Sequence, residues 1–177
     1  MKPISVYTPA LEKGMDIYSE LKDEPLDIGG YSPENFDGSY KGSVTMYEAL
    51  IKSYNVPAVW TLNEIGVQAG VEATERFGLP ITENDRNLSL GLGGLDEGVA
   101  PLNMAEAFSV FPNEGTRVEA HTITKIVDVQ GNTIAGWKKK ETKVTTKEIA
   151  QKMTYMLLGV VKEGTGKNAK LENHVMA

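Results

Sequence analysis

The spacing of apolar residues along the chain predicts several helices. A Thr-x-x-Glu capping box at residues 45–48 precedes a short apolar pattern of helical period, which runs to about Ser53. Pro57 then fits the first turn of a second helix, which is predicted to end at Gly66. The two helices are expected to meet in a tight elbow, and such an elbow can direct the side chains of Ser53 and Asn55 into a cleft.

Two later segments have the same helical period. Apolar positions predict a scaffold helix over residues 67–77. A second capping box, Thr145-Thr-Lys-Glu148, is expected to begin a long amphipathic helix that ends at Gly164. The methionine and leucine residues of that helix are typical of a face that packs into a core.

One segment has the period of a β-strand. β-Branched residues alternate from His121 to Val129, residues 130–132 are typical of a turn, and Thr133–Trp137 returns as a second strand. This pattern predicts a β-hairpin.

The stretch from Asp16 to Gly42 shows little apolar periodicity. It is rich in glycine, proline and aspartate, which predicts an irregular surface excursion. Its aromatic side chains are expected to pack the loop onto the core rather than to line a cleft. These residues are Tyr31, Phe36 and Tyr40.

The composition is that of an ordinary globular protein, and it removes several classes of site. The 177 residues, 41% hydrophobic and 24% charged, suffice for one domain with a sizeable core. A net charge of −6 argues against a nucleic-acid partner. The absence of cysteine excludes disulfides, thiolate catalysis and cysteine–zinc sites, and two histidines are too few for a histidine-based metal site.

Neither a cofactor nor a membrane segment is expected in this chain. The glycine-rich run at residues 88–95 lacks both the G-x-G-x-x-G spacing and a Walker lysine. The sequence has no apolar run of about 18 residues, the length that a membrane-spanning helix requires.

The elbow carries the most specific motif of the chain. A Ser-x-Asn tripeptide is weak evidence alone, because short motifs recur by chance. Here Ser53-Tyr54-Asn55 is followed by Val-Pro-Ala-Val, and the whole closely resembles the middle motif of penicillin-binding protein transpeptidase domains, particularly the bifunctional kind that also carries a glycosyltransferase. Ser32-Pro-Glu-Asn35 resembles a Pro-x-Asn element that often precedes the elbow in that family. Residues 101–111 resemble a Pro-Leu-x-Met-Ala helix of the family's cleft wall, with Pro101 in the first turn.

Both ends of the chain resemble neighbours of the other family motifs. Met1–Gly14 resembles the helix opened by Ser-x-x-Lys-Pro, so that Lys2 would be the motif lysine and the nucleophilic serine would lie three residues before it. Residues 163–169 resemble the Gly-Thr-Gly segment that precedes the Lys-Thr-Gly strand, and His174–Ala177 resembles the start of that strand. We therefore expect a single partial transpeptidase domain over residues 1–177, truncated at both ends.

The resemblance implies an α+β fold. The chain would form the mostly helical part of the penicillin-binding protein transpeptidase and serine β-lactamase-like fold, with a β-hairpin from an incomplete antiparallel sheet. Open sheet edges, at the hairpin or at His174–Ala177, would then favour self-association.

The resemblance also implies a function. Enzymes of the family are D,D-transpeptidases that cross-link peptidoglycan stem peptides through an acyl-serine intermediate, at the outer face of the bacterial cytoplasmic membrane, and they are acylated by β-lactams. In this assignment Lys2 is the candidate base, Ser53 relays a proton, and Asn55 holds the acyl-donor amide. Only one of the three motifs is complete, so the chain alone is expected to be inactive.

Two other classes of protein stay open. A serine β-lactamase or a D,D-carboxypeptidase would share the motif geometry, although residues 120–164 resemble the transpeptidases of bifunctional synthases more closely. A non-catalytic helical binding module is the second alternative, and in it Lys2 would be an ordinary solvated lysine. The histidines, His121 and His174, are expected in structural or surface roles rather than in a catalytic triad.

Overall fold

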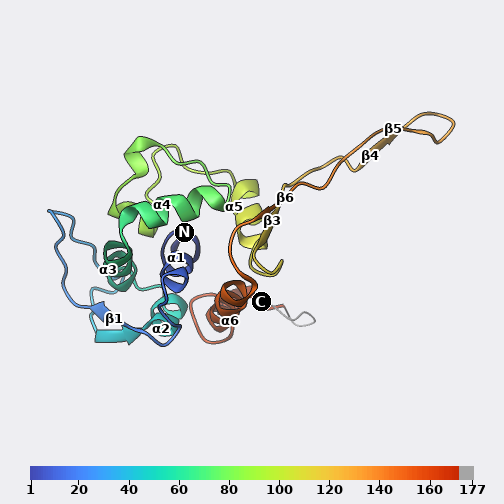
Figure 1. Ribbon diagram of the computed structural model, residues 1–177. Coiled ribbons are helices and arrows are strands. Elements are labelled where there is room, and N and C mark those ends of the chain that lie inside the picture. The colour runs from blue at the N-terminus through green and yellow to red at the C-terminus, as the bar shows by residue number, and fades with distance from the viewer. Residues whose placement is uncertain (172–177) are drawn as a thin grey trace.

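The chain starts as a helical rod that is buried on every side. The computed structural model describes residues 1–171, and in it a π-helix, η1 (Pro3–Tyr7), continues directly into α1 (Thr8–Glu12). The other helices surround this rod (Figure 1). In chain order they are α2 (Met46–Ile51), α3 (Val56–Ile65), α4 (Val67–Arg76), η2 (Glu83–Asp85), η3 (Leu88–Leu92), α5 (Pro101–Ser109), α6 (Lys147–Lys162) and η4 (Lys167–Ala169).

The strands form antiparallel pairs of two rather than one large sheet. They are β1 (Glu20–Asp23) with β2 (Gly42–Thr45), β3 (Thr116–Val118) with β6 (Glu141–Lys143), and β4 (Lys125–Val127) with β5 (Thr133–Gly136). The combination of a helical body with small antiparallel sheets confirms the predicted α+β class.

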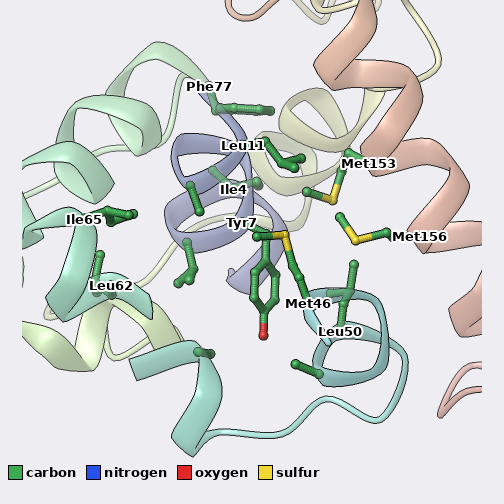
Figure 2. Packing of buried hydrophobic residues seen from close by; sticks show 14 of the residues in the cluster. Ile4, Tyr7, Leu11, Met46, Leu50, Leu62, Ile65, Phe77, Met153 and Met156 are labelled. Carbon is green, nitrogen blue, oxygen red and sulfur yellow. The ribbon is translucent and has the colours of Figure 1, made fainter. Parts of the chain in front are cut away.

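The hydrophobic core is built around the rod. Figure 2 shows Tyr7 and Leu11 of the rod among side chains that come from α2, α3 and α6. Ile4, Val6 and Tyr7 are completely buried, as are Met153 and Met156 of α6. The rod also buries Ser5 and Thr8, whose hydroxyls donate to the carbonyls of Leu90 and Pro3. Packing on every side fixes the rod, so the residue that precedes it, Lys2, starts from a rigid support.

Tyr7 is a polar exception in this core. Its hydroxyl has no hydrogen-bond partner among the residues that the structure describes. Burial raises the pKa of the phenol above its ordinary value. An unpaired buried hydroxyl costs about 1–3 kcal/mol of stability, which the large apolar area of the ring offsets.

The predicted elbow between two helices is confirmed. Thr45 caps α2, with its Oγ1 accepting a hydrogen bond of 3.1 Å from the backbone N–H of Glu48. Helix α3 has Pro57 in its first turn and ends at Gly66, whose φ is 85°. The helices expected over 67–77 and 101–111 are also present, as α4 and α5.

The prediction of an irregular excursion over residues 16–42 is wrong in part. The segment contains β1, which pairs with β2 in the register Leu21 to Val44. A strand of four residues with one apolar residue facing the core has too short a pattern to be recognised from sequence. Phe36 is 103% exposed and does not pack onto the core, whereas Tyr31 and Tyr40 are half-buried.

The predicted capping residue of the last long helix is wrong by one position. Thr146, not Thr145, is the N-cap of α6, and its Oγ1 accepts a bond of 3.2 Å from the N–H of Ile149. Thr145 instead continues the extended chain after β6, where its N–H donates to the carbonyl of Gly115. The helix therefore starts one residue later than the sequence motif indicates.

The hairpin exists, but it does not pack on the helical body. Strands β4 and β5 project from it (Figure 1), and their apolar side chains Ile126, Val127 and Ile134 are exposed. Within residues 1–171, no helix combines the length and apolarity that crossing a membrane requires. The strand expected at 174–177 lies outside the described residues.

Candidate active site

Ser53 ends α2 in a conformation that serine rarely adopts. Its φ is 58°, in the left-handed region. The N–H of Ser53 donates to the carbonyl of Leu50, and the N–H of Tyr54 donates to the carbonyl of Ala49, each at 3.0 Å. This pair of bonds is the Schellman motif, which usually has glycine at the left-handed position. The elbow therefore carries backbone strain of about 1–2 kcal/mol at Ser53.

The amine of Lys2 joins the two ends of the elbow. Its Nζ donates to the backbone carbonyl of Ser53 at 2.6 Å, to Oδ1 of Asn55 at 2.7 Å and to Oγ of Ser53 at 3.1 Å. Lys2 and Ser53 are 51 residues apart in sequence. The structure thus brings together all three site residues that the sequence singled out.

The surroundings of Lys2 favour its neutral form. Burial lowers the pKa of the amine from 10.5 to about 8. Its hydrogen-bond partners are neutral oxygens, which solvate an ammonium but do not neutralise its charge. A fraction of the amine is therefore unprotonated near neutral pH, and an unprotonated amine can act as a base.

The carboxamide of Asn55 is oriented by two opposite contacts. Its Oδ1 accepts from Lys2, and its Nδ2 donates to the carbonyl of Glu34 at 2.9 Å. A primary amide has two N–H donors. One of them is used by Glu34, which leaves the other for a ligand.

A fourth residue, Asn35, supports the elbow and was not among the predicted site residues. Its Oδ1 accepts from the N–H of Asn55 at 2.9 Å and from the N–H of Val56 at 3.1 Å. The available signal was the Pro-x-Asn element at residues 33–35, but nothing in the local sequence connects that element to the start of α3.

A cleft with a volume of about 500 Å³ opens at these residues. Lys2, Ser53 and Asn55 form its polar side, and the opposite walls are mainly apolar. Those walls comprise Met1, Pro3, Leu50, Leu92, Phe108, Leu157, Val160 and Thr165. The size and the few convergent polar groups are typical of a small-molecule site.

The segment after α6 is attached to the same elbow. The N–H of Thr165 donates to the carbonyl of Ile51 at 3.0 Å, at the end of α2. The hydroxyl of Tyr47 donates to Oε1 of Glu163 at 2.5 Å. These contacts place Thr165 on the cleft wall, in the stretch whose sequence resembles the Gly-Thr-Gly segment.

Other sequence candidates lie away from the cleft. His121 stacks on Trp137 with ring centroids 3.6 Å apart, at the base of the hairpin. The exposed Phe36 lines a separate hollow of about 130 Å³, which it shares with Ser53 and Tyr54. That hollow is small for a substrate.

Known proteins resemble this chain in sequence. The family model described as penicillin binding protein transpeptidase domain matches residues 1–176. The chain is 47% identical over 165 residues to penicillin-binding protein 1F of Bacillus subtilis, covering 93% of this chain and 23% of the relative. It is 40% identical over 178 residues to penicillin-binding protein 2a of Streptococcus pneumoniae, covering 100% of this chain and 24% of the relative. The chain thus spans about a quarter of the length of these relatives.

Solved structures show the same fold. Penicillin-binding protein 1A from Haemophilus influenzae superposes with a TM-score of 0.83 at 24% identity, over 94% of this chain and 31% of that one. An imipenem acyl-enzyme complex of penicillin-binding protein A from M. tuberculosis superposes with a TM-score of 0.83 at 21% identity, over 97% of this chain and 45% of that one. The family match over nearly all residues, together with the Lys2, Ser53 and Asn55 cluster, leads to one conclusion: the chain belongs to the penicillin-binding protein transpeptidase family.

Proposed function

We propose that this chain supplies the base and the proton relay of a serine D,D-transpeptidase site that cross-links peptidoglycan stem peptides. The observation that carries the proposal is the amine of Lys2, bonded to Ser53 Oγ and Asn55 Oδ1 at the cleft. A base of lowered pKa beside a second hydroxyl is the arrangement that serine acyl transfer requires. The whole protein would act at the outer face of the bacterial cytoplasmic membrane.

In the acylation step, a proton moves from the serine to the leaving amine, and a C–O bond to the serine replaces the C–N bond of the donor peptide. The neutral amine of Lys2 takes the proton of a serine hydroxyl three motif positions before it, and the serine oxygen bonds to the carbonyl carbon of the donor peptide. As the C–N bond breaks, the hydroxyl of Ser53 passes a proton from Lys2 to the leaving amine. Attack by the amine of a second stem peptide on the acyl-serine reverses these steps and forms the cross-link.

Asn55 orients the donor in this scheme. The free N–H of its Nδ2 donates to the acyl-donor amide, while the bond to the carbonyl of Glu34 keeps the carboxamide in place. An uncharged group suits this role because it binds the amide without changing the charge near Lys2.

β-Lactams would enter the same reaction. The acyl-enzyme complex of the M. tuberculosis relative with imipenem supports this class of ligand. Opening of the lactam leaves the amine attached to the acyl group, so the acyl-serine persists where a peptide amine would have departed. Rapid turnover of the β-lactam would instead favour the β-lactamase alternative.

The test is the rate of β-lactam acylation in a protein that contains this chain and the motif serine. We expect Ser53→Ala and Asn55→Ala each to slow acylation by about 10²–10⁴-fold, the usual effect of losing a positioned proton-transfer group. Ser43→Ala and Asn63→Ala, both at exposed positions, are matched controls that should acylate normally. Wild-type rates in both elbow variants would refute the assignment.

We also propose that the hairpin mediates self-association. Among residues 1–171 each of its two strands pairs only with the other, which leaves one edge of each unpaired there, and Ile126, Val127 and Ile134 add exposed apolar surface. We expect the apparent mass in light scattering to rise with concentration and to fall in Ile126→Lys. A wild-type chain that stays monomeric at high concentration would contradict this.

A further inference from the structure

The side chain of Asn35 is buried and fully hydrogen-bonded. It is 3% exposed. Its Oδ1 accepts from the N–H groups of Asn55 and Val56, and its Nδ2 donates to Oδ1 of Asp23 at 2.7 Å and to the carbonyl of Ser39 at 2.9 Å. These four bonds use both lone pairs and both N–H groups of the amide.

The orientation of this amide is set by Asp23. The carboxylate of Asp23 is buried at the end of β1, where its Oδ2 also accepts from the N–H of Lys41 at 3.0 Å. An ionised carboxylate only accepts hydrogen bonds, so Nδ2 of Asn35 must face it. The opposite atom, Oδ1, is thereby directed at the start of α3.

Asn35 binds the start of α3 from outside the helix, while the side chain of Asn55 makes no capping bond of its own. Asparagine is among the strongest N-cap residues, because its own oxygen can accept from the N–H groups of the first turn. Asn55 is the N-cap of α3, yet it has φ −88° and ψ −45°, makes no capping bond and directs its oxygen at Lys2. Asn35, 20 residues earlier, accepts instead from the N–H groups of Asn55 and Val56, and these two bonds hold the backbone of Asn55 in its helical conformation.

We propose that Asn35 is a positioning residue for acyl transfer: by bonding the N–H groups of Asn55 and Val56, it holds the backbone of Asn55 in the conformation that directs its carboxamide at Lys2 and the donor amide. This inference rests on the proposed function. Without Asn35, the backbone of Asn55 would relax to the extended conformation of an ordinary N-cap. Because Pro57 has no N–H, Asn55 would then bond the N–H of Ala58 and withdraw its oxygen from Lys2.

A double-mutant cycle on β-lactam acylation tests this, in a protein that contains this chain and the motif serine. We expect Asn35→Ala to slow acylation by about 10²-fold, as displacement of a reacting group by about 1 Å does. In the Asn55→Ala background the same change should slow acylation by less than about threefold, because its target is already absent. The loss of unfolding free energy on removing Asn35 should be larger in the Asn55→Ala background, because only an intact Asn55 can compensate by bonding the N–H of Ala58.

Exchanging the two buried side chains keeps the test decisive if Asn35→Ala does not fold. Asn35→Asp retains the acceptors for α3 but sets two carboxylates against each other, whereas Asn35→Asp with Asp23→Asn restores a donor–acceptor pair. We expect slow acylation in the first variant and recovery to within about tenfold of wild type in the second, since the exchange removes the repulsion between two carboxylates and restores the hydrogen bond between positions 23 and 35.

The possible results separate the two claims. If Asn55→Ala is slow, three results would overturn the positioning role. They are acylation at the wild-type rate in Asn35→Ala, an equal rate loss in both backgrounds, and no recovery in the exchanged pair. Wild-type acylation in both Ser53→Ala and Asn55→Ala would overturn the proposed function itself.

Discussion

Ser53 holds a strained backbone at the point where its hydroxyl meets Lys2. Its φ of 58° lies where glycine is usual, at the left-handed position of a Schellman motif. The residue is exposed, so its β-carbon adds little packing, and the strain agrees with the proposed use of its hydroxyl. Stability and activity are thus expected to oppose each other at this residue.

Replacing Ser53 with glycine should therefore stabilise the chain and abolish its contribution to acylation. We expect the unfolding free energy of Ser53→Gly to exceed that of Ser53→Ala by about 1 kcal/mol, because only glycine relieves the strain. Urea denaturation of the two variants measures this difference. Ser43→Gly, in strand β2, is the control and should be destabilised. Equal stability of the glycine and alanine variants at Ser53 would contradict the strain.

Lys2 should couple the stability of the fold to pH. Its pKa is lowered from 10.5 to about 8, so between these values the folded amine is neutral while the unfolded amine is protonated. The unfolded state then binds more protons, and stability rises with pH in this window. We expect the wild type to gain stability relative to Lys2→Met as the pH rises from about 8 to 10.5. Thermal unfolding across this pH range measures the difference in stability between the wild type and Lys2→Met. Lys22→Met, at an exposed position, is the matched control. A stability difference that does not depend on pH would contradict the lowered pKa.

Among the elements, the helices were predictable because their signals are local. Capping residues and the apolar period lie within one or two turns, as at Thr45 and Pro57. The start of α6 shows the limit of such signals. Thr145 and Thr146 are both suitable caps in sequence, and the bond from the Thr145 N–H to the carbonyl of Gly115, 30 residues away, decides between them.

The two threonines provide a matched pair of substitutions. Thr146→Ala removes the bond to the N–H of Ile149 and should cost about 1 kcal/mol of unfolding free energy. Thr145→Val replaces a buried hydroxyl that has no partner among the described residues, so it should be neutral or stabilising. Chemical denaturation distinguishes the two. A larger loss at Thr145 would show that the cap was assigned to the wrong residue.

At the scale of the whole molecule, the site depends on contacts that no local pattern contains. Lys2 reaches Ser53 across 51 residues, and Asn35 reaches Asn55 across 20. The resemblance to the transpeptidase family singled out Lys2, Ser53 and Asn55, but physical reasoning from the residues alone connected only the last two, through the elbow. Asn35 could not be found in this way, because its role arises only when the β1–β2 pair brings Asp23 beside it.

The central claim is that Lys2 is the base for acyl transfer, and the pH dependence of β-lactam acylation tests it most directly. In a protein that contains this chain and the motif serine, the rate constant should fall about tenfold per pH unit below the pKa of the base, because only the neutral amine accepts the proton. The bend in the profile should lie near the lowered pKa of Lys2, about 8. A rate that does not change as the pH falls well below 8 would contradict the account.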